Sequence, residues 1–281
     1  AAALAELHRR ASRWYQAHEL PREAIHHSLA ARDWDEAMDL LAVESTPLFR
    51  GGEMITLLGW LKAIPEDVIR TRPQAYLDYA SALLFTNEFE AAENALLELE
   101  GRTDLEDALR GRVLASHAMF AIMRRQQAPA MELSRAALEL LPREDSVYRA
   151  GLTLQLGGIQ LDRGRLEDAE SLLKEAYSLG RQTNQNWTAV TAAGWLGLIA
   201  IQRGRLSQAL QQVEEALKRA GSSPAAAISH SFLGSFLYER NDLDLALSHI
   251  HRAFELGSLL GAAPMAHEAT QYRLMLISLA R

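Results

Sequence analysis

One alanine recurs along the chain at a nearly constant interval, each time five residues after a turn. The copies stand at Ala92, Ala130, Ala169, Ala209 and Ala246, separated by 37 to 40 residues, and a fainter copy stands at Ala37. Seven positions after the five regular copies comes another small or apolar residue, at Leu99, Ala137, Ala176, Ala216 and Ala253. Tandem copies at such a period are typical of repeat proteins, in which each unit buries its apolar face on its neighbour. This period restricts the chain to a stack of similar units.

The stretch from 151 to 180 shows how one unit is built. Apolar residues at helical spacing are followed by Gly164, which can end a helix because glycine accepts a left-handed backbone. A second helical stretch follows, and Gly157 and Ala169 are small where the two helices should approach closely. One unit is therefore predicted to be an antiparallel helix pair. The predicted apolar faces consist of Leu152, Leu156 and Ile159 in the first helix and Leu166, Ala169, Leu173 and Ala176 in the second.

This spacing resembles the tetratricopeptide repeat (TPR). The interval exceeds the usual 34 residues, so we expect slightly longer helices or loops. No alternating run is convincing enough for a strand. We predict an all-α fold, a right-handed superhelix of antiparallel helix pairs; the alternative is an unrelated helical bundle with accidental self-similarity. The matching features are Leu156-Gly157, Leu196-Gly197 and Leu233-Gly234, the turn residues Gly164, Gly204 and Asn241, the alanine that follows each turn, and Pro142, which closes one copy.

The repeat boundaries predict two regions. Residues 1–72 are expected to form an N-terminal helical linker region with one degenerate helix pair, and residues 73–281 a continuous superhelix of TPR-like repeats. The stretch from 50 to 73 reads as an inserted helix pair. The chain has no initiator methionine and begins inside a pattern, so we expect a fragment of a longer protein.

Prolines mark several predicted helix starts. Ser223 is expected to cap a helix that has Pro224 in its first position, because proline has no N–H to lose there. Pro21, Pro65 and Pro73 are expected to play the same part.

Composition excludes several classes of function. The 281 residues include 48% apolar residues, enough for a large core, and carry a formal net charge of −7. A domain that binds nucleic acid by itself usually has a basic excess, so we expect no direct contact with nucleic acid. The absence of cysteine excludes disulfides and thiolate zinc sites. With no signal peptide and no apolar run of about 18 residues, we expect a cytoplasmic protein that does not contact a membrane.

Catalytic motifs are missing from the sequence. It has no phosphate-binding loop, dinucleotide fingerprint, nucleophile elbow or H-E-x-x-H motif. His249 and His251 are two positions apart and so point in different directions on a helix, and His26 and His27 have the same difficulty. These histidines read as ordinary surface or packing residues, and the carboxylates of 96–100 and 213–218 as solvated charge. We expect no enzyme, no catalytic residue and no metal site.

The first helices of the pairs carry the candidate binding residues. In this repeat type they line the concave side, the usual binding surface. Aromatic, amide, hydroxyl and methionine side chains together suit a small polar ligand or a partner peptide. Trp187 and Trp195 could instead serve only to pack neighbouring helices. The candidates are Arg112, Met119, Met123, Trp187, Thr191, Trp195, Gln202, Ser231, Ser235 and Tyr238, with Leu198 on the same stripe.

The N-terminal segment carries the more distinctive motifs. Residues 4–100 resemble the region that follows the ATPase module in large LuxR-type, MalT-like transcriptional activators. The resemblance rests on His8-Arg9-Arg10-Ala11-Ser12, Trp14-Tyr15, Ala24-Ile25-His26-His27, Asp33-Trp34 and the phrase LLGWLKAIPEDVIRTRP at 57–73.

This resemblance implies an effector-sensing and relay domain. In that family an N-terminal module binds ATP and a C-terminal helix-turn-helix domain reads DNA, so no cofactor is expected in this chain itself. The repeats between them would receive a small inducer or a regulatory protein, contact other domains of the parent protein and permit self-association. The alternative is a TPR adaptor that binds a peptide or partner protein.

Overall fold

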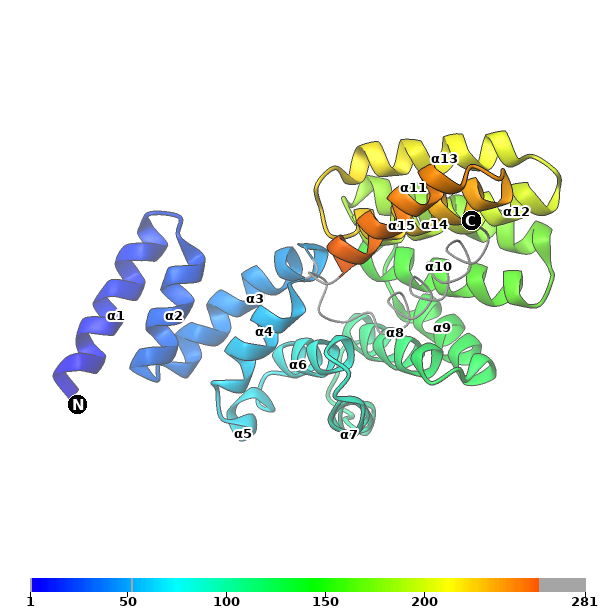
Figure 1. The fold of residues 1–281 in the computed structure, drawn as a ribbon. Helices are drawn as coiled ribbons and strands as arrows, with labels where there is room; N and C mark the ends of the chain where they lie inside the picture. Colours follow the sequence, from blue (N-terminus) through cyan, green and yellow to red (C-terminus); the bar gives the residue numbers. More distant parts are fainter. Residues whose placement is uncertain (1, 52, 258–281) are drawn as a thin grey trace. The chain divides into compact units, whose positions relative to one another are not determined.

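Helices fill almost all of the chain that the computed structural model describes, residues 2–51 and 53–257, and those residues contain no strand. The chain divides into two compact units, Ala1–Leu109 and Arg110–Arg281, each described by itself below. Helices α1 and α2, for example, form an antiparallel hairpin closed by a short turn (Figure 1).

The first unit contains α1 (Ala2–Ala17), α2 (Pro21–Ala31), α3 (Trp34–Gly51), α4 (Met54–Lys62), α5 (Glu66–Ile69), α6 (Pro73–Phe85) and α7 (Phe89–Glu100). The second unit, which begins within α8, contains α8 (Asp107–Met123), α9 (Gln127–Leu140), α10 (Ser146–Asp162), α11 (Leu166–Gln182), α12 (Asn186–Gln202), α13 (Leu206–Ala220), α14 (Ala226–Glu239) and α15 (Leu243–Gly257). Residues 258–281 of the predicted repeat region lie outside the described residues.

Each repeat turns on a residue with a left-handed backbone. In the α10–α11 turn, Gly164 has φ +72°, and the N–H of Arg165 reaches back to the carbonyl of Gln160 at 2.9 Å. This bond satisfies a carbonyl at the helix end that would otherwise lack a partner. Ala169 N–H then bonds to Arg165 O at 3.0 Å and so starts the second helix. The same positive φ occurs five positions before the other regular alanines, at Asn87, Arg125, Gly204 and Asn241.

The recurring alanines occupy equivalent surroundings. Ala92, Ala130, Ala169, Ala209 and Ala246 are each 0% exposed, and the residues seven positions later are all buried. Because a larger side chain would push the paired helices apart, the alanine interval reports the helix contact itself. The predicted all-α, TPR-like repeat fold is confirmed.

The first unit uses the same turn twice in succession. Arg32 and Glu19 both have positive φ, and the alanines five positions later, Ala37 and Ala24, are each 0% exposed. The faint copy at Ala37 is therefore real, whereas the copy at Ala24 was missed. It stands too close to Ala37 for the regular interval because α2 belongs to both hairpins.

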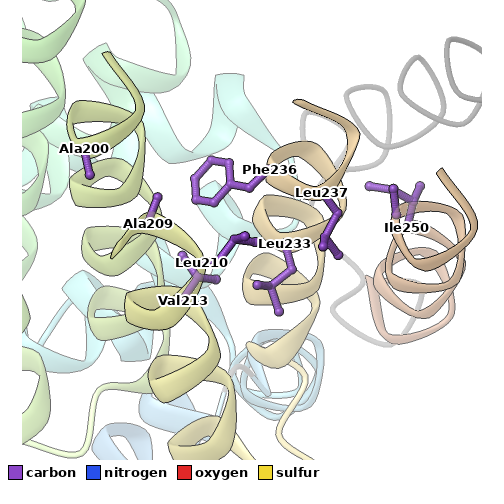
Figure 2. Close-up of a cluster of buried hydrophobic side chains, with 9 residues drawn as sticks. Ala200, Ala209, Leu210, Val213, Leu233, Phe236, Leu237 and Ile250 are labelled. Atoms are coloured by element: carbon purple, nitrogen blue, oxygen red, sulfur yellow. The ribbon is translucent and has the colours of Figure 1, made fainter. Parts of the chain in front are cut away.

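Side chains from successive pairs share one core in the second unit. Figure 2 shows Val213 of α13, Phe236 of α14 and Ile250 of α15 within one buried cluster. Gly197 of α12 makes room for this cluster, since a Cβ there would lie 2.6 Å from Phe236 Cε2. Gly157 likewise leaves space that Leu173 of α11 fills, as its small size predicted.

Proline positions agree with the predicted helix starts in part. Pro21 and Pro73 are the first residues of α2 and α6, whereas Pro65 precedes α5 as its N-cap. The predicted inserted pair corresponds to α4 and α5. The contacts divide the chain after Leu109, and the boundary predicted at 72/73 falls before α6 inside the first unit, where it stays a prediction.

The predicted cap at Ser223 is wrong. Helix α14 begins at Ala226 with Ala225 as its N-cap, and no side chain caps it. Ala226 N–H bonds to the backbone carbonyl of Ser223 at 2.9 Å, and Ala227 N–H bonds to that of Pro224 at 3.1 Å. The chain therefore enters the helix through tight turns that use the backbone of Ser223 in place of its hydroxyl.

Candidate functional site

The candidate residues lie on the first helices of the second unit, α8, α10, α12 and α14. These helices pack beside one another by placing a large side chain over a small one. Trp195 of α12 covers Gly158 of α10, where a Cβ would lie 2.6 Å from Trp195 Cζ3. Phe232 of α14 covers Gly194 of α12 in the same way, with a corresponding distance of 2.1 Å to Phe232 Cδ2. We call the exposed and partly buried residues of α8, α10, α12 and α14 the first-helix row.

The two tryptophans of α12 have different environments. Trp195 is partly buried against the cluster that includes Leu154 and Leu173. Its packing role is thus observed, and a role in ligand binding stays a prediction. Trp187, by contrast, is 41% exposed, so much of its indole surface is available to a ligand. Of the two, Trp187 is the better placed to report binding.

Two candidate hydroxyls are already engaged within their own helices. Thr191 Oγ1 donates to the carbonyl of Trp187 at 2.8 Å, and Ser235 Oγ donates to that of Ser231 at 2.9 Å. Hydroxyls in helices commonly bond back to the carbonyl four residues earlier. Thr191 and Ser235 can therefore accept a hydrogen bond from a ligand more readily than they can donate one.

Arg112 is anchored at the start of the row. Its Nε donates to Asp145 Oδ2 at 2.7 Å, and its guanidinium lies 5.6 Å from the centre of the Tyr148 ring. The Asp145 side chain is 7% exposed, compared with 34% for Arg112. Arg112 thus joins α8 to the beginning of α10.

The other candidates are dispersed along the row. Met119 and Met123 are partly buried on α8, and Ser231 is partly buried on α14. Gln202 is exposed at the end of α12, and Tyr238 packs against the cluster shared by α12 to α15. The candidates therefore share a row of helices, in which Arg112, Met119 and Trp195 each contact the neighbouring first helix.

Sequence reasoning missed Gln155 on α10. Its Nε2 lies 3.7 Å from Met119 Sδ, and its Oε1 has no hydrogen-bond partner among the described residues although the side chain is 7% exposed. A buried amide oxygen without a partner is costly. The signal was present, because Gln155 precedes the alanine of its repeat by the same interval as Trp195, but the glycines around it indicated only close packing.

Two histidine pairs were also missed. His8 of α1 meets His27 of α2 with 2.8 Å between their Nδ1 atoms, and His230 of α14 meets His249 of α15 at 2.9 Å. His249 is partly buried and His251 exposed, but both line one surface hollow, so the expectation that they point apart stays a prediction. No sequence signal pairs residues on separate helices until the hairpin register is known.

Two features of the described part of the chain concern metal binding and membrane insertion. It holds no group of three or more histidine or carboxylate side chains placed to share a metal ion. Within residues 2–51 and 53–257, every helix is too short or too polar to span a bilayer.

A family model of the MalT-like TPR region matches residues 111–281, more than half of the chain. The chain belongs to this family. The match covers all four helix pairs of the second unit and thus every candidate in the first-helix row. The motifs of residues 4–100 lie before the matched region.

Solved structures share the fold of this MalT-like TPR region at low sequence identity. A tetratricopeptide repeat protein from Parabacteroides merdae is 16% identical, with a TM-score of 0.63, and the alignment covers 98% of this chain and 99% of that one. A Signal Transduction ATPase with Numerous Domains (STAND) from Pyrococcus horikoshii, with a tetratricopeptide repeat sensor, is 13% identical with a TM-score of 0.68. That alignment covers 98% of this chain but 43% of the ATPase. A Rap protein complexed with Competence and Sporulation Factor is 15% identical, with a TM-score of 0.56 and coverage of 93% and 86%.

Proposed function

We propose that this chain is the effector-sensing and relay domain of a LuxR-type, MalT-like transcriptional regulator. The match of residues 111–281 to the MalT-like TPR region is the observation that carries the proposal. The fold shared with a STAND ATPase that has a TPR sensor supports it, because there too such repeats form part of a larger chain. ATP binding and DNA reading would belong to other domains of the parent protein.

The effector, a small inducer or a regulatory protein, would bind the first-helix row. Trp187 offers an exposed aromatic face, and the exposed part of Arg112 offers a positive charge. Met119 and Met123 add flexible apolar side chains that adapt to different shapes. Aromatic, charged and apolar groups on one row suit a ligand with an apolar body and a polar or anionic end.

Binding would act by shifting a conformational equilibrium. A ligand changes the balance between two states only if it binds one of them more tightly. Neighbouring first helices touch through Trp195 on Gly158 and Phe232 on Gly194, so a ligand that spans two helices favours one spacing over another. Small changes of this kind add along a repeat stack.

Tryptophan fluorescence and thermal unfolding test the proposal on the full chain. The probes are sugars, sugar phosphates and amino acids, screened one at a time. A true effector should raise the melting temperature of the wild type, and W187A should weaken its binding at least about tenfold because a buried aromatic contact is lost. W14A is the matched control, since Trp14 is 54% exposed on α1 of the first unit and belongs to no helix of the row. Equal effects of the two substitutions on every probe that binds would contradict a site at Trp187.

A TPR adaptor for a peptide or partner protein is the second candidate. The methionines of α8 favour it, because adaptable side chains suit polypeptide surfaces as well as small ligands. A photoreactive phenylalanine analogue at position 187, cross-linked in a lysate of the source cells, distinguishes the adaptor from the small-molecule sensor. A cross-link that adds the mass of a polypeptide supports the adaptor, and one that adds less than about 1 kDa supports the small-molecule sensor.

A further inference from the structure

Two hairpins hold a pair of histidine rings in nearly the same geometry. The ring centres of His8 and His27 are 5.1 Å apart with an interplanar angle of 37°, and those of His230 and His249 are 5.0 Å apart at 39°. Both pairs take the same repeat positions, relative to Ala24 and Ala246 respectively. One histidine comes from each helix, so each pair bridges its hairpin.

Other hairpins show that the fold does not require histidine at these positions. The equivalent residues are Leu114 and Leu133 in the α8–α9 hairpin and Thr153 and Leu172 in the α10–α11 hairpin. Leu114 and Leu133 pack beside the apolar cluster that α8 and α9 share. The histidine pairs therefore add a property that helix packing alone does not need.

A hydrogen bond between two Nδ1 atoms requires one N–H and one lone pair, so at least one ring must be neutral. When both rings are protonated, two N–H groups and two positive charges face each other across about 3 Å, which is strongly unfavourable at a partly buried site. The contact between His230 and His249 at 2.9 Å can thus form while at least one ring is neutral and is lost when both rings are protonated.

The surroundings of His230 disfavour its cation further. Burial, the neighbouring His249 and the guanidinium of Arg252 lower the pKa of His230 to about 4. Burial also lowers the pKa of His249, although the carboxylate of Glu214 on α13 opposes the shift.

Other charged groups from the adjoining helices do not reverse this balance. On α15, Asp244, His251 and Glu255 line the same surface hollow, and Glu255 Oε2 accepts a hydrogen bond from Arg252 at 2.8 Å. On α14 the other ionisable residues, Tyr238 and Glu239, stand at the far end of the helix, and α12 has no ionisable side chain.

We propose that His230 and His249 form an acid-sensitive latch that opens the α14–α15 hairpin when protons bind. In the open hairpin both rings are solvated and take up protons at their ordinary affinity, so acid favours opening. Helix α15 supplies Ala246, Ile250 and Ala253 to the core, and these apolar side chains would become exposed when the latch opens. The second unit would then change its surface between neutral and mildly acidic solution.

Amide hydrogen exchange of the full chain tests this latch between about pH 7 and pH 5. After correction for the intrinsic pH dependence of exchange, the opening constant of α15 should rise about tenfold per pH unit below the ordinary histidine pKa, for one proton taken up on opening. Helices α10 and α11, which carry Thr153 and Leu172 at the equivalent positions, are the internal reference and should respond less.

The variant H230L/H249L copies the leucine pair of the α8–α9 hairpin and should abolish the pH dependence of α15. The variant H8L/H27L should leave the pH dependence of α15 unchanged. An equal acid response of α15 and α11 in the wild type, or an undiminished response of α15 in H230L/H249L, would overturn the proposal. If the leucine variant does not fold, an NMR titration of the wild type decides, because titration of both His230 and His249 near their ordinary pKa also refutes the latch.

Discussion

Gly234 of α14 lies so close to Ile250 of α15 that a Cβ on the glycine would be 2.4 Å from Ile250 Cδ1. The α10–α11 pair has the equivalent contact, because a Cβ on Gly157 would lie 2.8 Å from Leu173 Cδ2. Both glycines belong to the Leu-Gly pairs of the repeat. The close approach of paired helices therefore depends on the missing side chain at one position.

Alanine at this position should destabilise the protein. G234A forces Ile250 out of its present conformation, and the backbone carbonyl of Ala246, 3.1 Å from the added Cβ, cannot move aside easily. We expect a loss of about 1–3 kcal/mol in the free energy of unfolding, the usual cost of overpacking. G151A is the control, since a Cβ there meets nothing within 4 Å, and it should gain about 0.5–1 kcal/mol from helix propensity. Urea unfolding of both variants measures these changes, and equal midpoints would refute the close-approach argument.

Arg125 is expected to be replaceable with a gain in stability. It turns the α8–α9 hairpin with φ +58°, a conformation that disfavours side chains with a Cβ. R125G should therefore stabilise the protein by about 0.5–1 kcal/mol, after the greater freedom of glycine in the unfolded chain is subtracted. The reverse change, G164A at φ +72°, should cost about 1 kcal/mol although nothing lies within 4 Å of the added Cβ. Thermal and urea unfolding measure whether each variant is more or less stable than the wild type, and a destabilised R125G variant would disprove this account.

The ion pair of Arg112 and Asp145 should stabilise the start of α10. Because the Asp145 side chain is 7% exposed, R112M leaves a nearly buried carboxylate without its guanidinium and should cost about 1–3 kcal/mol. The double variant R112M/D145N removes the charge as well and should recover part of that loss. A double-mutant cycle by urea unfolding measures the coupling, and purely additive effects would mean that the pair contributes nothing. Any binding experiment on Arg112 variants needs this cycle as its stability control.

The ion pair of Arg22 and Glu53 should give a small, acid-dependent contribution. Arg22 donates to both carboxylate oxygens of Glu53, at 2.8 and 2.7 Å, and this lowers the pKa of Glu53. Since the folded-state pKa lies below the unfolded one, the contribution is complete above the unfolded value and is lost as pH falls through the folded value. Both side chains are well exposed, so the free energy of unfolding of the wild type should exceed that of E53Q by only about 0.5 kcal/mol at pH 7. Urea midpoints of the two proteins should converge once the pH lies below the folded-state pKa of Glu53, and a difference that persists there would contradict the assignment.

Local pattern was enough to predict where the repeats turn and which alanines are buried. The turn at Asn241 and the alanine five positions on are set by neighbouring residues, so they can be seen in the sequence. The cap at Ser223 failed because tight backbone turns compete with side-chain capping, and propensity alone does not distinguish them. Trp195 suited both packing and ligand binding; only the structure shows that it packs over Gly158, and its role in ligand binding stays a prediction.

The amino-acid sequence by itself determined the helix pairs and their turns, because these depend on residues a few positions apart. Only the tertiary structure brought His230 to His249, Gln155 to Met119 and Arg112 to Asp145. Each of these contacts depends on the register in which two separate helices meet, and a shift of one residue along either helix turns the side chain to another face. The repeat alanines set that register through their packing against the partner helix, which exists only in the folded hairpin.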